Sequence, residues 1–226
     1  VKTLEDVVKV GDCVKIARTD DLGEVIAVSA SGLDAYFGAT ATGIGVGTEV
    51  ELVGQVEIAP DVSWLGRIVD PFGRPLDGRP LPRGCVPRAA AGSPPPAAAR
   101  KGVGDRLATG SACFDTLLPL VRGQRIGLFA GSGVGKSTLL GRLAQNVSSD
   151  VVVIALVGER GRELRDFVST VLGPEGLKRC VVVAATSDQS ALLRRQCIHT
   201  AMAVAESFRD EGQHVLFLAD SVTRYA

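Results

Sequence analysis

The sequence predicts an α/β fold, in which a parallel sheet carries helices on both faces and follows a smaller β-rich region. Three observations predict it. From about residue 106 onward, unbroken apolar runs alternate with amphipathic helical segments, a pattern typical of parallel strands buried on both faces. A glycine-rich loop at 130–138 lies between one such run and one such helix. Residues 1–70 carry short, β-branched runs instead, which favour a small barrel or sandwich.

The N-terminal region has the signals of a small β-domain. Its apolar runs are short and partly alternating, and Gly, Asp and Ser residues lie between them, as in strands joined by tight turns. A glycine-dense stretch at 43–47 follows no predicted strand and precedes no predicted helix, so we interpret it as a turn and not as a nucleotide loop. The predicted strands cover residues 14–16, 23–28 and 49–53.

A proline-rich segment separates this region from the rest of the chain. Prolines recur from residue 71 and culminate in Ser-Pro-Pro-Pro at 93–96. Proline cannot donate to a sheet and favours extended backbone, so we expect a linker lying along a domain surface. A ligand for an SH3-type domain is the alternative. The expected domains are a β-barrel at 1–75, the linker at 76–105, and an α/β core at 106–226 that is incomplete at its C-terminus.

The core region alternates strands and helices. Its clearest helix carries an apolar stripe from Leu193 to Phe208 and has Gly212 beyond its end, as a helix terminator. The expected elements are, in order, a strand at 125–129, a helix over 139–147, a strand at 151–157, a helix over 163–172 ended by Gly173 and Pro174, a strand at 180–185, the long helix before Gly212, and a strand at 214–220.

The loop at 130–138 reads Ala-Gly-Ser-Gly-Val-Gly-Lys-Ser-Thr and has the composition of a triphosphate cradle. Glycines let successive backbone N–H groups point at one anion, and the next helix adds the positive end of its dipole. Lys136 would place its charge on the β- and γ-phosphates of ATP, and the Ser137 hydroxyl would ligate Mg²⁺. Ala130 departs from the strict pattern, which has glycine there. The residues predicted to bind the nucleotide are Gly131, Ser132, Gly133, Val134, Gly135, Lys136, Ser137 and Thr138.

Charged residues follow two of the predicted strands. Asp220 ends the last strand, where its carboxylate would hold Mg²⁺ through water; a helix N-cap is the alternative role. Glu159 and Arg160 follow strand 151–157. Because ligands gather at the carboxyl ends of parallel strands, we predict that Glu159 polarises the attacking water and that Arg160 steadies the γ-phosphate or the Glu159 carboxylate. Together with Lys136 they form the predicted catalytic set, and a solvated charged turn is the alternative.

Other charged residues are expected to lie on the surface. Arg162, Glu163 and Arg165 would form an exposed cluster, which contributes little energetically. Arg194 and Arg195 lie early in the long helix, on an exposed face or at a contact across a subunit boundary.

Composition excludes several classes of function. Lys plus Arg equals Asp plus Glu at 25 each and only 4% of residues are aromatic, so no nucleic-acid partner is expected. No apolar stretch approaches the ~20 residues of a membrane span, and no signal-peptide core precedes the first strand, so we expect a cytosolic protein. Five dispersed cysteines and two histidines do not form a metal-binding pattern, and we expect buried, reduced thiols.

Three segments together resemble the type III secretion and flagellar export ATPases. They are residues 123–137, 158–163 and 219–226. Segments 65–70 and 73–78 are similar to that family's junction between barrel and core. Within the family, segments 105–110 and 184–196 look more flagellar than injectisome.

This resemblance implies the arrangement and partners of that family. It implies an N-terminal β-barrel, a RecA-like ATPase core and a C-terminal helical domain, in a ring that is usually a hexamer. It also implies a stator-like regulator, a coiled-coil stalk, export chaperone–cargo complexes, the export gate, and a place at the cytoplasmic face of the inner membrane. ATP hydrolysis would energise flagellar protein export, with Lys136, Ser137, Glu159, Arg160 and Asp220 in the roles given above.

The resemblance also predicts what this stretch of chain lacks. An adenine-packing segment, the helical domain and an arginine supplied to a neighbouring site would follow Ala226. Because such an arginine accelerates hydrolysis by ~10³–10⁵, we expect the isolated stretch to bind nucleotide weakly and to hydrolyse it slowly. The alternatives are a rotary ATP synthase subunit, an injectisome ATPase, an RNA-translocating ring ATPase and a non-catalytic, nucleotide-gated assembly module.

Overall fold

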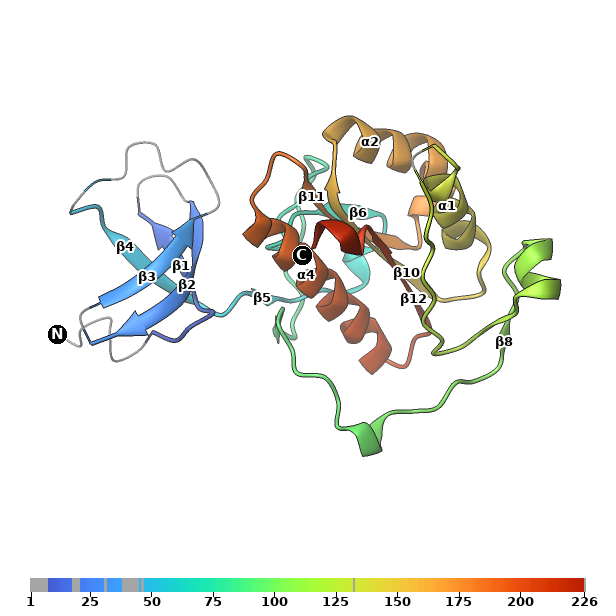
Figure 1. The fold of residues 1–226 in the computed structure, drawn as a ribbon, viewed down its shortest axis with the longest axis horizontal. Coiled ribbons are helices and arrows are strands. Elements are labelled where there is room, and N and C mark those ends of the chain that lie inside the picture. The colour runs from blue at the N-terminus through green and yellow to red at the C-terminus, as the bar shows by residue number, and fades with distance from the viewer. Residues whose placement is uncertain are drawn as a thin grey trace.

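A computed structural model shows two regions of unequal size joined by extended chain (Figure 1). A small antiparallel sheet holds the first strands, and a larger α/β region holds the remainder. The structure describes residues 8–17, 21–30, 32–37, 45, 47–131 and 133–225.

The N-terminal sheet has four antiparallel strands in the order β3-β2-β1-β4. Their bounds are Cys13–Ile16 for β1, Leu22–Ser29 for β2, Gly32–Phe37 for β3 and Val50–Gly54 for β4. The three strands expected from the sequence are confirmed, and β3 was not predicted. Val8, Val14 and Val25 form the small core of this sheet. Most of the stretch 43–47, interpreted as a turn, lies outside the described residues.

Short elements connect this sheet to the core. They are β5 (Glu57–Ile58), the 3₁₀ turn Val62–Trp64, β6 (Arg67–Val69), β7 (Arg88–Ala89), the 3₁₀ turn Ala97–Ala99, β8 (Arg106–Leu107), the π-helical turn Cys113–Leu117 and β9 (Leu120–Val121). Strand β6 pairs with β11 of the large sheet, although a domain boundary at residue 75 would leave it with the first domain. The boundaries at residues 75 and 105 stay predictions.

The linker expected at 76–105 lies on the core surface only in part. Arg88 forms ion pairs with Glu206, at 3.2 Å, and with Asp210, and so joins β7 to a long helix of the core. Residues 91–106 are all exposed, and this stretch bows outward from the core (Figure 1).

The large sheet is parallel, in the order β12-β10-β11-β6. Its elements are α1 (Lys136–Asn146), β10 (Val151–Glu159), α2 (Gly161–Asp166), the π-helical segment Phe167–Leu172, α3 (Gly173–Leu177), β11 (Cys180–Thr186), α4 (Ala191–Asp210), β12 (Val215–Asp220) and the 3₁₀ turn Val222–Arg224.

Helices cover both faces of this sheet, as the sequence predicts. Alternate residues of β10 and β11 point to opposite sides. One set, with Val153 and Val183, packs against Cys197 and Phe208 of α4. The other set, with Ile154, packs against α1 and the segment after α2. Figure 1 shows α1 and α2 on one side of the sheet and α4 on the other.

The strand predicted at 125–129 does not form. Among the described residues no strand pairs with this segment, and β12 lies at the edge of the sheet. The segment runs without regular structure, and Phe129 is 97% exposed. A β-strand is stable only with a hydrogen-bonded neighbour, so the apolar pattern alone was not sufficient. The helix expected to end at Gly173 does so: Gly173 is the C-cap of the π-helical segment, with φ +64° and ψ 173°, and the separate short helix α3 runs from there to Leu177.

The cysteine prediction is only partly confirmed. Cys13, Cys180 and Cys197 are buried, and burial raises the pKa of each thiol. Cys85 and Cys113 are exposed, so for these two the prediction is wrong. No helix in the described part of the chain is both long and apolar enough to cross a bilayer.

A buried ion pair fixes the junction before the core, and we expect its loss to be costly. Arg67 donates to both carboxylate oxygens of Asp77, at 2.6 and 2.8 Å, and to two carbonyls. Asp77→Ala should lower the free energy of unfolding by about 3 kcal/mol, because it leaves the Arg67 charge buried and unpaired. Urea denaturation at pH 7 measures this.

The matched control is Glu175→Ala, which breaks an exposed pair with Lys178 and should change stability by under about 1 kcal/mol. Because Arg67 holds the pKa of Asp77 well below its usual range, the stabilisation is complete at neutral pH and is lost as the pH falls below about 4. Equal losses in the two variants would contradict this interpretation.

Candidate nucleotide-binding site

The glycine-rich loop runs directly into α1 with its backbone amides exposed. Gly133 and Gly135 have φ angles of +78° and +94°, a left-handed backbone that residues with a Cβ rarely adopt. Gly135 is the N-cap of α1, and no side chain caps that end. The free N–H groups of the first helical turn therefore form an anion-binding end. Ser132, predicted to be part of the cradle, lies outside the described residues.

The first side chain of α1 reaches the end of β12. The Lys136 ammonium lies 2.5 Å from an Asp220 carboxylate oxygen, and the Asp220 side chain is only 6% exposed. Strand β12 ends at Asp220, which pairs in register with Leu156 of β10. The structure thus brings together the loop lysine and the strand-end carboxylate that the sequence predicted as phosphate and magnesium groups.

A cavity of about 220 Å³ lies beside this pair. Ser137, Glu159 and Asp220 all line it, so three residues predicted from separate segments converge at one place. The cavity also contacts Glu163 and a wall of apolar side chains. These are Leu156, Leu164, Phe167 and Val171.

The Asp220 carboxylate fits a role in holding Mg²⁺. Its Oδ1 atom is buried and accepts no hydrogen bond within the described residues, and the Lys136 ammonium is its ion-pair partner. Mg²⁺ bound with a nucleotide needs only one or two protein oxygens, because phosphates and waters supply the others. A single carboxylate and the Ser137 hydroxyl on the same cavity meet that requirement.

Glu159 is half-ionised near neutral pH. Its pKa is raised to about 7, first by burial and then by a hydrogen bond shared with Glu163, while Arg224 opposes the shift. The same contact lowers the pKa of Glu163, so the proton of the pair resides on Glu159. A carboxyl group with a pKa near the working pH is suited to proton transfer.

Arg224 is a site residue to which sequence reasoning gave no role. The chain leaves Asp220 through a cis peptide bond and enters the 3₁₀ turn Val222–Arg224. The Arg224 guanidinium lies 3.2 Å from the Glu159 carboxylate and donates to the carbonyl of Gly158. Its position four residues after Asp220, the aspartate that ends β12, was the sequence feature that could have indicated its role.

Gly158 makes room for this arginine. It has a φ angle of +70°, and a Cβ there would lie 2.8 Å from Arg224 Cδ. The pairing of β10 with β11 shifts register between Val157 and Glu159. The irregular glycine therefore turns the end of the strand so that Glu159 faces the cavity.

Two charged residues at the start of α2 lie differently relative to the cavity. Arg160 does not line the cavity: its side chain is 77% exposed and lies 3.8 Å from Glu163. Glu163 is exposed together with Arg162 and Arg165, as expected, and it also lines the cavity and shares a hydrogen bond with Glu159. The side-chain directions at the start of α2 determine which of these two residues lines the cavity, and the spacing of charges in the sequence does not show those directions.

Comparison with known proteins agrees with this site. The model of the ATP synthase alpha/beta family, nucleotide-binding domain, matches residues 110–226, a range that holds the loop, Glu159 and Asp220. The chain belongs to the ATP synthase alpha/beta family. The resemblance to export ATPases, inferred from the loop and strand-end segments, is confirmed by curated relatives and by a solved structure.

Curated members of this family resemble the chain over most of its length. The flagellum-specific ATP synthase of Caulobacter vibrioides is 52% identical over 81% of the chain and 42% of its own length. That of Bacillus subtilis is 50% identical over 82% and 43%. The SPI-2 type 3 secretion system ATPase of Salmonella typhimurium is 43% identical over 96% and 50%. The chain thus spans about half the length of these relatives.

A solved structure of this family matches nearly the whole fold. The ATPase EscN, assembled and in complex with its central stalk EscO, from the enteropathogenic E. coli type III secretion system, superposes with a TM-score of 0.90. It is 39% identical in sequence, and the match covers 97% of this chain and 54% of EscN.

The contact between Gly158 and Arg224 allows a test of the site that needs no ligand. We expect Gly158→Ala to displace Arg224 and so to raise the pKa of Glu159 above about 7, because the opposing positive charge moves away. A ¹³C NMR titration of the Glu159 carboxyl measures it.

Gly212→Ala is the matched control. Gly212 has a φ angle of +87° with no atom near its would-be Cβ. Both substitutions should cost about 1 kcal/mol of stability, but only the first should move the Glu159 titration. An unchanged pKa in Gly158→Ala would remove Arg224 from the site.

Proposed function

We propose that this chain is part of an ATP-hydrolysing motor subunit that energises flagellar, type III protein export. The convergence of Ser137, Glu159 and Asp220 on one cavity beside the start of α1 carries the proposal. The names of the flagellum-specific relatives support the assignment to export.

In this proposal the loop and Lys136 bind the terminal phosphates of ATP. The residues of the cradle are Gly131, Ser132, Gly133, Val134, Gly135, Lys136, Ser137 and Thr138, as the sequence predicted. The triphosphate takes Lys136 from Asp220, because the phosphates carry more negative charge than one carboxylate. Backbone N–H groups at the start of α1 donate to the phosphate oxygens.

Glu159 then prepares the attacking water. Its ionised carboxylate accepts a proton from the water as the oxygen attacks the γ-phosphorus, and the bond from that phosphorus to the β–γ bridging oxygen breaks. The products are ADP and inorganic phosphate. Arg224 holds the Glu159 carboxylate in position, with the charge that its 3.2 Å contact provides. Arg160 joins the γ-phosphate only if its exposed side chain turns inward.

Ser137 and Asp220 would hold Mg²⁺, the first through its hydroxyl and the second through water. The metal ion supplies charge neutralisation at the β- and γ-phosphate oxygens. The buried carboxylate of Asp220, which lines the same cavity as Ser137, supports this role.

We infer the larger assembly from the relatives. The domains are an N-terminal β-barrel at 1–75, a linker at 76–105 and a RecA-like core at 106–226, with β6 contributing to the core sheet. Like subunits form a ring, usually a hexamer, around a coiled-coil stalk, and the solved assembly of EscN with EscO supports this. A stator-like regulator, chaperone–cargo complexes and the export gate complete the partners, at the cytoplasmic face of the inner membrane.

An injectisome ATPase is the second candidate function. The SPI-2 ATPase matches 96% of the chain at 43% identity, close to the 97% at 44% of the flagellum-specific ATP synthase of Rhizobium meliloti. The flagellar proteins of Caulobacter vibrioides and Bacillus subtilis are more similar in sequence, at 50–52% identity against 43%, and this favours flagellar export. Motility of a strain that lacks the gene distinguishes the two, because only the flagellar role predicts loss of filaments.

The catalytic proposal is tested in the full-length protein with Glu159→Gln. This substitution keeps the size and hydrogen bonds of the side chain but removes the base. We expect kcat for ATP to fall by about 10²–10⁴ while the Kd for ATP stays within about threefold, measured by phosphate release and by titration with a fluorescent nucleotide.

Arg162→Gln is the control, because Arg162 is exposed and does not line the cavity. It should leave both constants unchanged. Turnover at the parent rate in Glu159→Gln would contradict the proposed role, and it would favour a nucleotide-gated module that does not depend on hydrolysis.

A further inference from the structure

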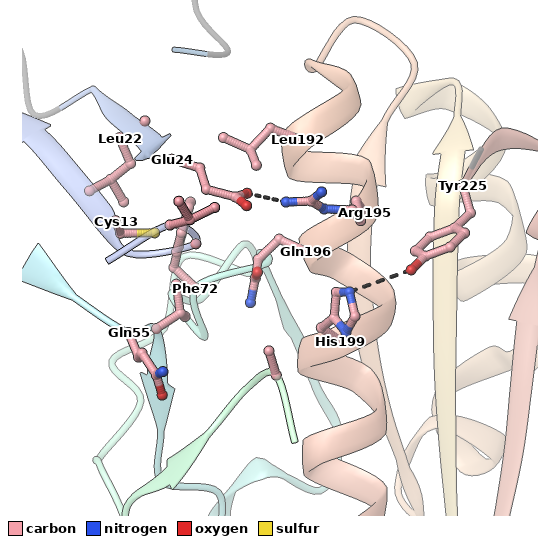
Figure 2. A pocket seen from close by; sticks show the side chains of 15 residues that line it. Cys13, Leu22, Glu24, Gln55, Phe72, Leu192, Arg195, Gln196, His199 and Tyr225 are labelled. Carbon is pink, nitrogen blue, oxygen red and sulfur yellow. Dashed lines mark hydrogen bonds and ion pairs between the residues drawn. The ribbon is translucent and has the colours of Figure 1, made fainter. Parts of the chain in front are cut away.

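Helix α4 faces both the N-terminal sheet and the core. Its apolar side packs on the large sheet, with Cys197 and Phe208 fully buried. Its other side borders a cavity of about 400 Å³, which Cys13, Leu22 and Gln55 line from the first domain (Figure 2). The two sides of this cavity are not closely packed against each other.

One polar contact ties α4 to the N-terminal sheet. Arg195 forms an ion pair with Glu24 of β2 across the cavity (Figure 2). The Glu24 side chain is 17% exposed and that of Arg195 46%. Arg195 therefore contacts another part of its own chain, where the sequence had suggested an exposed face or a subunit boundary.

A second polar contact ties α4 to the catalytic segment. His199 lies one turn beyond Arg195, and its Nε2 is 3.4 Å from the Tyr225 hydroxyl. The two rings meet edge to face, with centroids 6.1 Å apart. Burial and the nearby Arg195 lower the pKa of His199, so its neutral ring can accept from the tyrosine.

Tyr225 directly follows the arginine that holds Glu159. Arg224 contacts both the Glu159 carboxylate and the Gly158 carbonyl. Two side-chain contacts, Glu24–Arg195 and His199–Tyr225, are thus joined through the backbone of α4. The backbone from Tyr225 to Arg224 then leads to the segment that positions Glu159.

We propose that α4 couples the N-terminal sheet to the catalytic segment, with Arg195 and His199 as positioning residues. When the sheet shifts against α4, the Glu24–Arg195 pair changes first, and the His199–Tyr225 contact passes the change to residues 221–225. This inference concerns the control of the site and rests on the proposed function only for its consequence in ATP turnover. The contacts themselves predict a coupling that can be measured without nucleotide.

The experiment reverses the charges of the ion pair in the full-length protein. Glu24→Arg and Arg195→Glu each replace the attraction by repulsion, and the double substitution restores it with opposite signs. Hydrogen exchange of the backbone amides at 221–225, without nucleotide, is the first measurement. We expect each single variant to exchange about two- to fivefold faster there, the range that a partly exposed ion pair gives, and the double variant to return to the parent rate.

Two further variants separate coupling from a general loss of stability. Tyr225→Phe removes the hydroxyl without changing charge, and it should accelerate exchange at 221–225 by a similar factor. Combined with Arg195→Glu it should add little, because both break the same series of contacts. Reversing the exposed Glu175–Lys178 pair of α3 is the control, and it should leave these amides unchanged.

Unchanged exchange at 221–225 in both single charge variants would overturn the coupling. The second measurement, kcat and KM for Mg-ATP determined separately, addresses its consequence: the single variants should lower kcat more than they raise KM. If the parent protein fails to hydrolyse ATP, the proposed function fails, and the exchange measurement still decides the coupling.

Discussion

The ion pair between Lys136 and Asp220 is the interaction on which the site depends. A carboxylate that is 6% exposed is costly to bury unless a charge compensates it, and the ammonium at the start of α1 does so at 2.5 Å. The pair joins the glycine-rich loop to the end of β12. Without nucleotide it keeps the loop near the sheet edge, and an incoming triphosphate competes for the same ammonium.

The sheet determines where the other groups lie. Parallel pairing places the ends of β10 and β12 side by side, with Asp220 opposite Leu156. Glu159 then lies three residues beyond that position, after the register shift at Gly158. A glycine at this point also admits Arg224, whose charge keeps the raised pKa of Glu159 from rising further. One backbone irregularity thus sets both the direction and the ionisation of the proposed base.

Local sequence patterns predicted the parts of the fold that depend on local physics. The buried strands β10 and β11, the apolar stripe of α4 and the loop before α1 follow from hydrophobic periodicity and glycine placement. Segment 125–129 has the same apolar pattern, but a strand also needs a hydrogen-bonded neighbour. No strand of the described sheet pairs with this segment. Strand β6 was not predicted, because its three residues carry little sequence signal and its partner β11 is far away in sequence.

In the candidate site too, the residues fixed by local sequence position could be predicted, and the contacts set by tertiary packing could not. Lys136, Ser137, Glu159 and Asp220 could be predicted because each occupies a fixed place after a strand or in the loop. The contacts of Glu163 and Arg224 with Glu159 could not, because they depend on side-chain directions set by tertiary packing. Arg160 follows Glu159 in sequence, but its side chain is 77% exposed, and its role at the γ-phosphate stays a prediction.

The most direct test of the account is the Mg²⁺ dependence of ATP binding in Asp220→Asn. Calorimetric titrations with and without Mg²⁺ compare it with the parent. We predict that the variant binds metal-free ATP more tightly, because Lys136 is released and a negative charge is removed. We also predict that the tightening by Mg²⁺, about tenfold or more in the parent, becomes several-fold smaller, because only the Ser137 hydroxyl then remains to hold the ion. Full retention of the Mg²⁺ effect, with unchanged affinity for metal-free ATP, would contradict the central role of this pair.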